Sequence, residues 1–135
     1  MSKLIEDLTK EHALIVDVLK KVKELGVGSK EGKAKLLSAK EGLLAHLKKE
    51  DEELYPILKK AAEADKGLKR TLEVFAQDMG EISKFALDFF DKYSQGESSG
   101  VEFAKDFGRL FVILGGRVRK EEGILYAAYE KLSHA

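Results

Sequence analysis

The feature that most constrains the fold of this chain is a repeated spacing of apolar residues, three and four positions apart, along four long segments. This spacing places the apolar side chains on one face of an α-helix, which completes a turn about every 3.6 residues. Only one proline occurs in 135 residues, so helix-breaking positions are rare. The sequence therefore predicts an all-α protein built from four amphipathic helices.

The four segments are separated by short polar and glycine-rich stretches at 26–32, near Asp65 and at 94–100. Short connections between long helices favour an up-down-up-down four-helix bundle. We expect Ser2 and a Ser99–Glu102 capping box to begin two of the helices, and a kink near Pro56. The apolar stripes are Ile5, Leu8, His12, Ile15, Leu19 and Val22; Leu36, Ala39, Leu43, His46, Glu50, Leu54, Ile57 and Ala61; Leu68, Leu72, Phe75, Met79, Ile82, Ala86, Phe89 and Tyr93; and Phe103, Phe107, Leu110, Leu114, Arg117, Glu121, Ile124, Ala128 and Leu132.

Composition narrows the possible functions. The length is that of one ordinary domain, so we expect residues 1–135 to form a single bundle domain. The absence of cysteine excludes disulfides and thiolate ligands, which limits any metal site to imidazole, carboxylate, phenolate or thioether donors. Lys+Arg and Asp+Glu both number 24 and are interleaved, so no basic face indicates nucleic acid. Without a signal peptide or an apolar run of spanning length, we expect a cytoplasmic protein with no membrane partner.

Five positions in the stripes hold polar residues where apolar ones are expected: His12, His46, Glu50, Arg117 and Glu121. Charged side chains are rarely buried unless they are paired or bind a metal. His46 and Glu50 are four residues apart, as are Arg117 and Glu121, so each pair projects from one helix face. A single buried histidine usually bonds a backbone carbonyl instead. Two histidines at matching depth with two carboxylates are harder to explain in that way. We expect these five side chains to lie at the same height along the bundle axis.

An internal repeat supports this arrangement. The segment HLKKEDEELYPILKKA (46–61) aligns without gaps to RVRKEEGILYAAYEKL (117–132), which pairs Glu50 with Glu121 and places Arg117 at the position of His46. EHALI (11–15) aligns similarly to DMGEI (78–82), which places Met79 at the position of His12. The chain thus has the pattern of two helical hairpins related by a pseudo-twofold axis.

These motifs resemble the haemerythrin family, also called the HHE cation-binding domain, over essentially the whole chain. The resemblance is carried by Glu11-His12 and by H-x-x-x-E-[DE]-x-x-L-Y-P from His46 to Pro56. It implies a four-helix bundle in which each hairpin contributes one histidine and one H-x-x-x-[ED] pair to a di-iron centre. Carried over residue by residue, it implies that His12, His46, Glu50 and Glu121 are metal ligands.

The second half of the family pattern is altered, because Met79 and Arg117 stand where histidines are expected. The remaining two histidines and two glutamates would suit one divalent ion, with iron favoured and zinc or manganese as alternatives. A guanidinium repels a second cation, whereas beside Glu50 and Glu121 it would replace that ion with bidentate hydrogen bonds. We therefore interpret Arg117 as a surrogate for the lost metal and Met79 as core filler.

Several functions remain open from the sequence. The first is a protein with at most one metal ion in a sensing, storage or redox role, with O₂ or another small molecule as a candidate ligand. The second is a metal-free bundle whose Arg-Glu-His network serves structure or partner binding. The third is an intact di-iron O₂-binding protein that recruits other ligands, such as Glu53 or Tyr126. A non-enzymatic role is favoured, because no phosphate-binding, dinucleotide-binding or nucleophile motif occurs. We expect the hydroxyls of Tyr55 and Tyr126 to serve packing.

Overall fold

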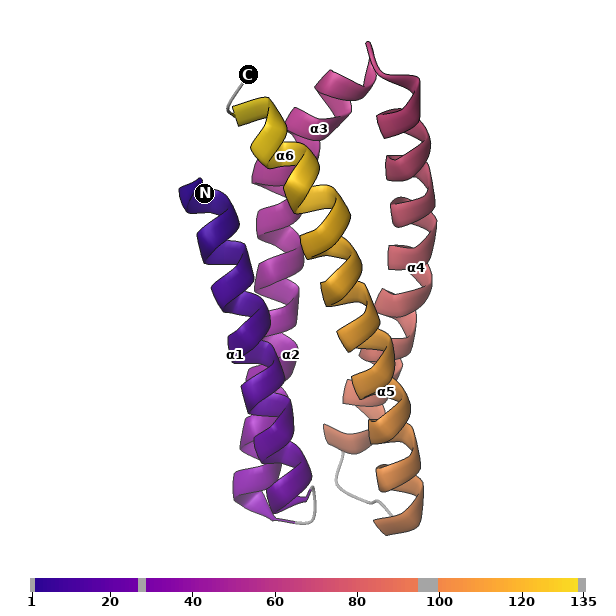
Figure 1. The fold of residues 1–135 in the computed structure, drawn as a ribbon. Helices are drawn as coiled ribbons and strands as arrows, with labels where there is room; N and C mark the ends of the chain where they lie inside the picture. The colour runs from indigo at the N-terminus through magenta and orange to yellow at the C-terminus, as the bar shows by residue number, and fades with distance from the viewer. Residues whose placement is uncertain (1, 27–28, 95–99, 134–135) are drawn as a thin grey trace.

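The computed structural model describes residues 2–26, 29–94 and 100–133, and nearly all of these residues are helical (Figure 1). The first helix is α1 (Lys3–Leu25), and the third is α4 (Lys66–Ser94). The second runs through α2 (Lys30–Lys49), the π-helical turn η1 (Glu50–Leu54) and α3 (Tyr55–Ala62). The fourth runs through α5 (Gly100–Lys120), the π-helical turn η2 (Glu121–Leu125) and α6 (Tyr126–Ser133).

The helices form the predicted up-down-up-down bundle. α1 packs against α2 and α5, and α4 packs against α2, α3 and α5, so that chain neighbours are also neighbours in space. In Figure 1 the N-terminus of α1 and the end of α6 lie at the same end of the bundle. The Ser2 backbone N–H and hydroxyl both donate hydrogen bonds to Glu130, at 2.8 and 2.9 Å, which joins the first helix to the last.

Serine caps begin the first two helices. Ser2 accepts a hydrogen bond from the Ile5 N–H at 3.3 Å, as predicted, and Ser29 accepts one from the Gly32 N–H at 3.0 Å. The second helix therefore begins inside the stretch 26–32 that was predicted to be a loop. Gly32 is required there, because a Cβ atom at this position would lie 1.6 Å from the Gly26 carbonyl oxygen. The predicted Ser99–Glu102 capping box begins outside the described residues.

The interior of the bundle has an apolar cluster at each end and a polar layer between them. One cluster includes Leu19, Leu36 and Phe90, and the other includes Leu8, Leu58 and Phe75. On the first, second and fourth helices the polar positions fall between members of the two clusters. The buried polar residues of this layer are His12, His46, Glu50, Arg117 and Glu121. All five polar positions predicted from the stripes are therefore buried.

The two π-helical turns correct the predicted kink and part of the predicted stripes. In η1 the Tyr55 N–H bonds to the Glu50 carbonyl, five residues back, one turn before the expected kink site. Pro56 lies in the first turn of α3, where its missing N–H costs little. Proline is not the requirement for the π turn, because η2 has the same geometry and Ala127 stands at the equivalent position.

Each π turn inserts one extra residue and advances the buried face by one position. Ile57 and Ile124, predicted to face the core, are each 46% exposed. Leu58 and Leu125, one residue further along, are fully buried. The prediction for the ends of these two stripes is therefore wrong, because it assumed an unbroken α-helical period beyond Glu50 and Glu121.

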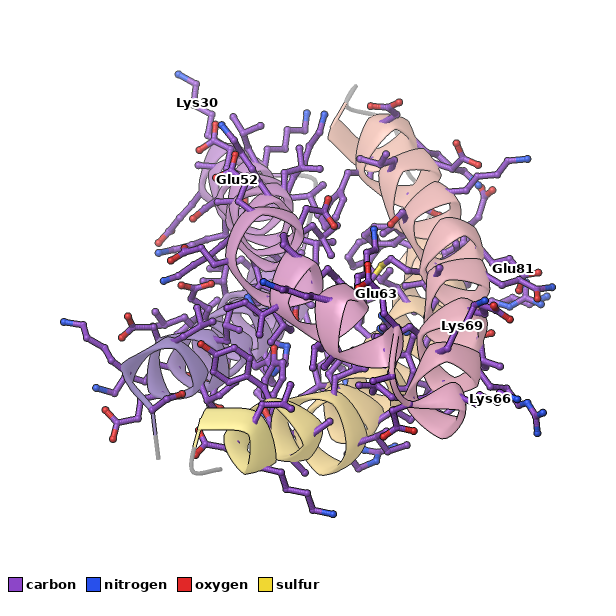
Figure 2. All side chains as sticks on the ribbon, turned by 90° about the horizontal axis from the view of Figure 1, so that it is seen from above. Lys30, Glu52, Glu63, Lys66, Lys69 and Glu81 are labelled. Atoms are coloured by element: carbon purple, nitrogen blue, oxygen red, sulfur yellow. The ribbon has the colours of Figure 1, made fainter. Side chains whose placement is uncertain are left out.

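Charged side chains cover the outside of the bundle. In the view from above in Figure 2, Lys30 and Glu81 point away from the bundle, and both are exposed. Within the part of the chain that the structure describes, none of the helices has the length and apolar character needed to span a bilayer.

Candidate metal centre

Four buried side chains from three helical segments converge in the polar layer. One donor atom each from His12, His46, Glu50 and Glu121 lies within 4.8 Å of the others. The His12 Nε2 atom is 2.9 Å from Glu121 Oε1, and the His46 Nε2 atom is 3.5 Å from Glu50 Oε2. The His46 Nε2 atom is also 4.0 Å from Glu121 Oε1. The structure thus brings together all four of the predicted ligands.

Two further glutamates hold the imidazole rings in place. The Nδ1 atom of His12 is 2.8 Å from Glu122 Oε2, and that of His46 is 2.8 Å from Glu11 Oε1. A carboxylate at Nδ1 requires that nitrogen to carry the proton, which leaves Nε2 free to donate its lone pair. Both Nε2 atoms point into the space between Glu50 and Glu121. Neither Glu11 nor Glu122 was predicted to have this role, because both occupy partly exposed helix positions.

Tyr126 also enters the polar layer. Its hydroxyl donates a hydrogen bond to Glu50 Oε2 at 2.8 Å, and lies 3.2 Å from the Nε2 atom of His12 and 3.5 Å from that of His46. The expectation that this hydroxyl serves packing is therefore wrong. The π turn η2 explains the difference, because the extra residue rotates Tyr126 toward the interior.

Arg117 is buried beside the cluster, although its contacts differ from those predicted. Its Nε atom lies 3.4 Å from Glu121 Oε2 without a hydrogen bond. Its Nη1 and Nη2 groups donate to the Phe75 carbonyl at 3.3 Å and to the Tyr55 hydroxyl at 3.1 Å. The guanidinium also covers the Phe75 ring, 4.5 Å from its centroid. The predicted bidentate hydrogen bonds to Glu50 and Glu121 are therefore wrong.

A small cavity of about 40 Å³ adjoins the cluster. Its polar lining residues are His12, His46, Ser83, Arg117 and Glu121, and Met79 and Ile82 are among its apolar lining residues. The Met79 sulfur accepts a hydrogen bond from Ser83 at 3.3 Å. A volume of this size admits a water molecule or a diatomic ligand.

The family model described as Hemerythrin HHE cation binding domain matches residues 3–129. The chain belongs to the haemerythrin HHE cation-binding family. Neither a curated protein nor a solved structure matches the chain significantly. Membership of the haemerythrin family and the helical-bundle fold, both predicted from the sequence, are confirmed.

Charge is distributed unevenly among the side chains of the haemerythrin-family cluster. Burial raises the pKa of Glu121, and the neighbouring charge of Glu50 adds to this effect despite the contacts with His12 and Arg117. Burial would also raise the pKa of Glu50, but its contacts with His46, Tyr126 and Glu121 together outweigh burial and lower that pKa. For His46, burial would lower the pKa, but Glu50, Glu11 and Glu121 together raise it. A proton on His46 therefore partly balances the carboxylates.

The residues present suit a bound cation. Glu50 Oε1 and Glu121 Oε2 are buried without a hydrogen-bond partner, as is the Nε atom of Arg117. Buried carboxylate oxygens are rarely left in this condition, because their desolvation is uncompensated. Glu11, Glu50, Glu121 and Glu122 contact the two imidazoles, while the nearby cations are Arg117, beside Glu121, and Lys49, 3.1 Å from Glu11. The carboxylates on the two imidazoles therefore outnumber the nearby cations, and a bound cation beside neutral imidazoles would balance the excess negative charge.

Proposed function

We propose that this haemerythrin-family protein binds one divalent metal ion, with iron favoured, between His12, His46, Glu50 and Glu121. The proposal is supported most directly by the carboxylate at each Nδ1 atom, 2.8 Å from His12 and 2.8 Å from His46. Metal-binding histidines commonly donate this N–H to a carboxylate, which fixes the tautomer and the ring orientation and raises the basicity of the donor nitrogen. Two imidazoles arranged in this way beside two buried carboxylates form a donor set suited to iron, manganese or zinc.

Arg117 supports a capacity of one ion rather than two. It stands at the repeat position of His46, and its guanidinium is buried against Glu121 and Tyr55. Tyr55 is the repeat counterpart of Tyr126. The Tyr126 hydroxyl lies beside the two imidazoles, whereas the Tyr55 hydroxyl contacts Arg117, so Arg117 takes the place of the imidazoles in the second half of the layer. A permanent positive charge at this position repels a second cation.

The adjoining cavity indicates the functional role of the metal centre. Bound iron would supply Lewis acidity and one-electron chemistry, and its small ligands would occupy the cavity of about 40 Å³ beside His12 and His46. Apart from the His, Glu and Arg117 side chains, the lining is mostly apolar, which favours a small molecule such as a diatomic one. We therefore place the protein among sensing, storage or redox proteins with a single metal ion.

Metal analysis of the intact chain tests this proposal. Protein stripped with a chelator is reloaded anaerobically with ferrous, manganous or zinc ions, and bound ions per chain are counted by mass spectrometry of the elements. We expect about one ion for the wild type, a marked loss in His46→Ala, and no loss in the control Glu53→Gln, because Glu53 is exposed on the same helix. A count near two would contradict the role given to Arg117.

A metal-free network is the competing function, and the ion pairs of His46 favour it. With its raised pKa, a protonated His46 pairs with Glu11 and Glu50 and replaces part of the charge of a metal. In that case the layer would serve structure or partner binding. Metal analysis separates the two functions, because a count near zero for the reloaded wild type would support the network.

A further inference from the structure

The hydroxyl of Tyr126 lies among the donor atoms of the candidate metal centre rather than beside them. It is 2.8 Å from Glu50 Oε2, 3.2 Å from His12 Nε2 and 3.5 Å from His46 Nε2. The side chain is almost fully buried, and its ring stacks on that of His12 with an interplanar angle of 9°. The position of this oxygen is therefore well defined by packing and by three polar neighbours.

These distances correspond to those between atoms bound to a common ion. With metal–ligand bonds of about 2.1 Å, adjacent donors lie about 3.0–3.4 Å apart and opposite donors about 4.2 Å apart. The three distances from the Tyr126 hydroxyl fall close to the adjacent range, as does the 2.9 Å between His12 Nε2 and Glu121 Oε1. The 4.0 Å between His46 Nε2 and Glu121 Oε1 is close to the opposite value. The distances given among these five atoms are close to those within one five-coordinate site.

The π turn η2 directs the Tyr126 side chain toward the cluster. The Tyr126 N–H bonds to the Glu121 carbonyl, five residues back, so the two residues lie one turn apart on the same side of the helix. Tyr55 occupies the same place after η1, but its hydroxyl accepts a hydrogen bond from Arg117 at 3.1 Å. The repeat therefore provides two equivalent tyrosines, of which one faces the ligands and the other faces the arginine.

We propose that the phenolate oxygen of Tyr126 is a fifth protein ligand of the bound ion when that ion is ferric iron. This inference rests on the proposed function, because it requires an ion between the two histidines and two glutamates. Coordination breaks the Tyr126 O–H bond and forms an oxygen–metal bond, and the proton leaves to solvent. The phenolate raises the negative charge of the donor groups from the two of Glu50 and Glu121 to three, which matches ferric rather than ferrous iron.

Visible absorption and resonance Raman spectroscopy of iron-loaded protein test this ligand directly. The chain is loaded with ferrous ions, oxidised with ferricyanide and freed of excess reagent, and bound iron is counted in the same sample. We expect a phenolate-to-iron charge-transfer band with tyrosine ring modes in the wild type. Tyr126→Phe should lose the band while keeping about one iron per chain. The matched control Tyr55→Phe should keep both the band and the iron.

The outcomes separate this inference from the proposed function. Wild-type protein that holds one ferric ion per chain without the band would overturn the role of Tyr126 and leave the four-ligand site intact. A band that persists in Tyr126→Phe, or disappears instead in Tyr55→Phe, would overturn it as well. Wild-type protein that takes up no iron would overturn both. The Raman ring modes of the wild type identify a tyrosine ligand without reference to any variant.

Discussion

Glu11 should control metal affinity without binding the ion. Its carboxylate lies 2.8 Å from the Nδ1 atom of His46 and 3.1 Å from Lys49. Loss of a carboxylate behind a ligating imidazole typically costs about 10-fold to 100-fold in metal affinity. Glu11 is 31% exposed, so solvent screens part of its charge. We expect Glu11→Gln, which keeps a neutral acceptor, to weaken zinc binding about tenfold, or about 1.4 kcal/mol. Glu11→Ala, which also frees the ring, should approach about 100-fold.

The assay is competition for zinc against a chromophoric chelator, because zinc has no redox chemistry to complicate the equilibrium. Asp78→Asn is the matched control. Asp78 is the repeat counterpart of Glu11. In its half of the repeat Arg117 replaces the histidine, so Asp78 has no equivalent imidazole to support. Thermal unfolding in excess chelator shows whether each variant folds. If Glu11→Ala binds zinc as tightly as the wild type, or if Asp78→Asn weakens binding equally, carboxylate support of His46 is refuted.

Three other changes test separate parts of the structure. Met79→His combined with Arg117→His should raise the metal content from about one ion per chain to about two; unchanged uptake would show that the repeat alignment is wrong. Asp106→Asn should lower the free energy of unfolding by about 1 kcal/mol at pH 7. The hydrogen bond from Tyr93 lowers the pKa of Asp106 in the folded protein. The stabilisation is therefore fully present above the pKa of this group in the unfolded chain, and it is lost as the pH falls through the lower pKa in the folded protein. Urea unfolding at pH 7 and 3 should therefore show a shrinking difference. Gly32→Ala should destabilise the protein by about 1–3 kcal/mol through its clash with the Gly26 carbonyl, whereas helix propensity alone predicts a higher melting temperature.

The period of the sequence predicted the fold well as far as the first residue of each π turn. Up to Glu50 and Glu121, positions three and four residues apart face the interior as expected. Beyond them Leu54 is still buried as predicted, but Leu58 and Leu125 are buried in place of Ile57 and Ile124. Apolar residues occupy both alternatives in both helices, and the pattern therefore could not distinguish an inserted residue from a regular helix.

The candidate ligands could be predicted because they interrupt an apolar stripe. Their supporting residues could not be predicted in this way. Glu11 and Glu122 occupy half-exposed positions, where acids are common, and each acts on a histidine of another helix. Such contacts depend on the rotation of two helices about their axes, which the period of either helix alone does not determine. For Tyr126, the i→i+5 spacing from Glu121 would have been informative only if the π turn had been known.

The repeat also explains why the polar layer persists although half of its imidazoles are missing. Glu50 and Glu121 are repeat counterparts, yet both face the same pair of histidines. Glu121 contacts His12 at 2.9 Å, so it belongs to the donor set of the first hairpin although it lies in the second hairpin. Replacing it by an apolar residue would therefore remove a donor from the remaining site. Because both carboxylates must stay, the second half of the layer needs a cation or a proton beside them. Arg117 supplies that charge, and its hydrogen bonds to the Phe75 carbonyl and to Tyr55 hold it there without any ion.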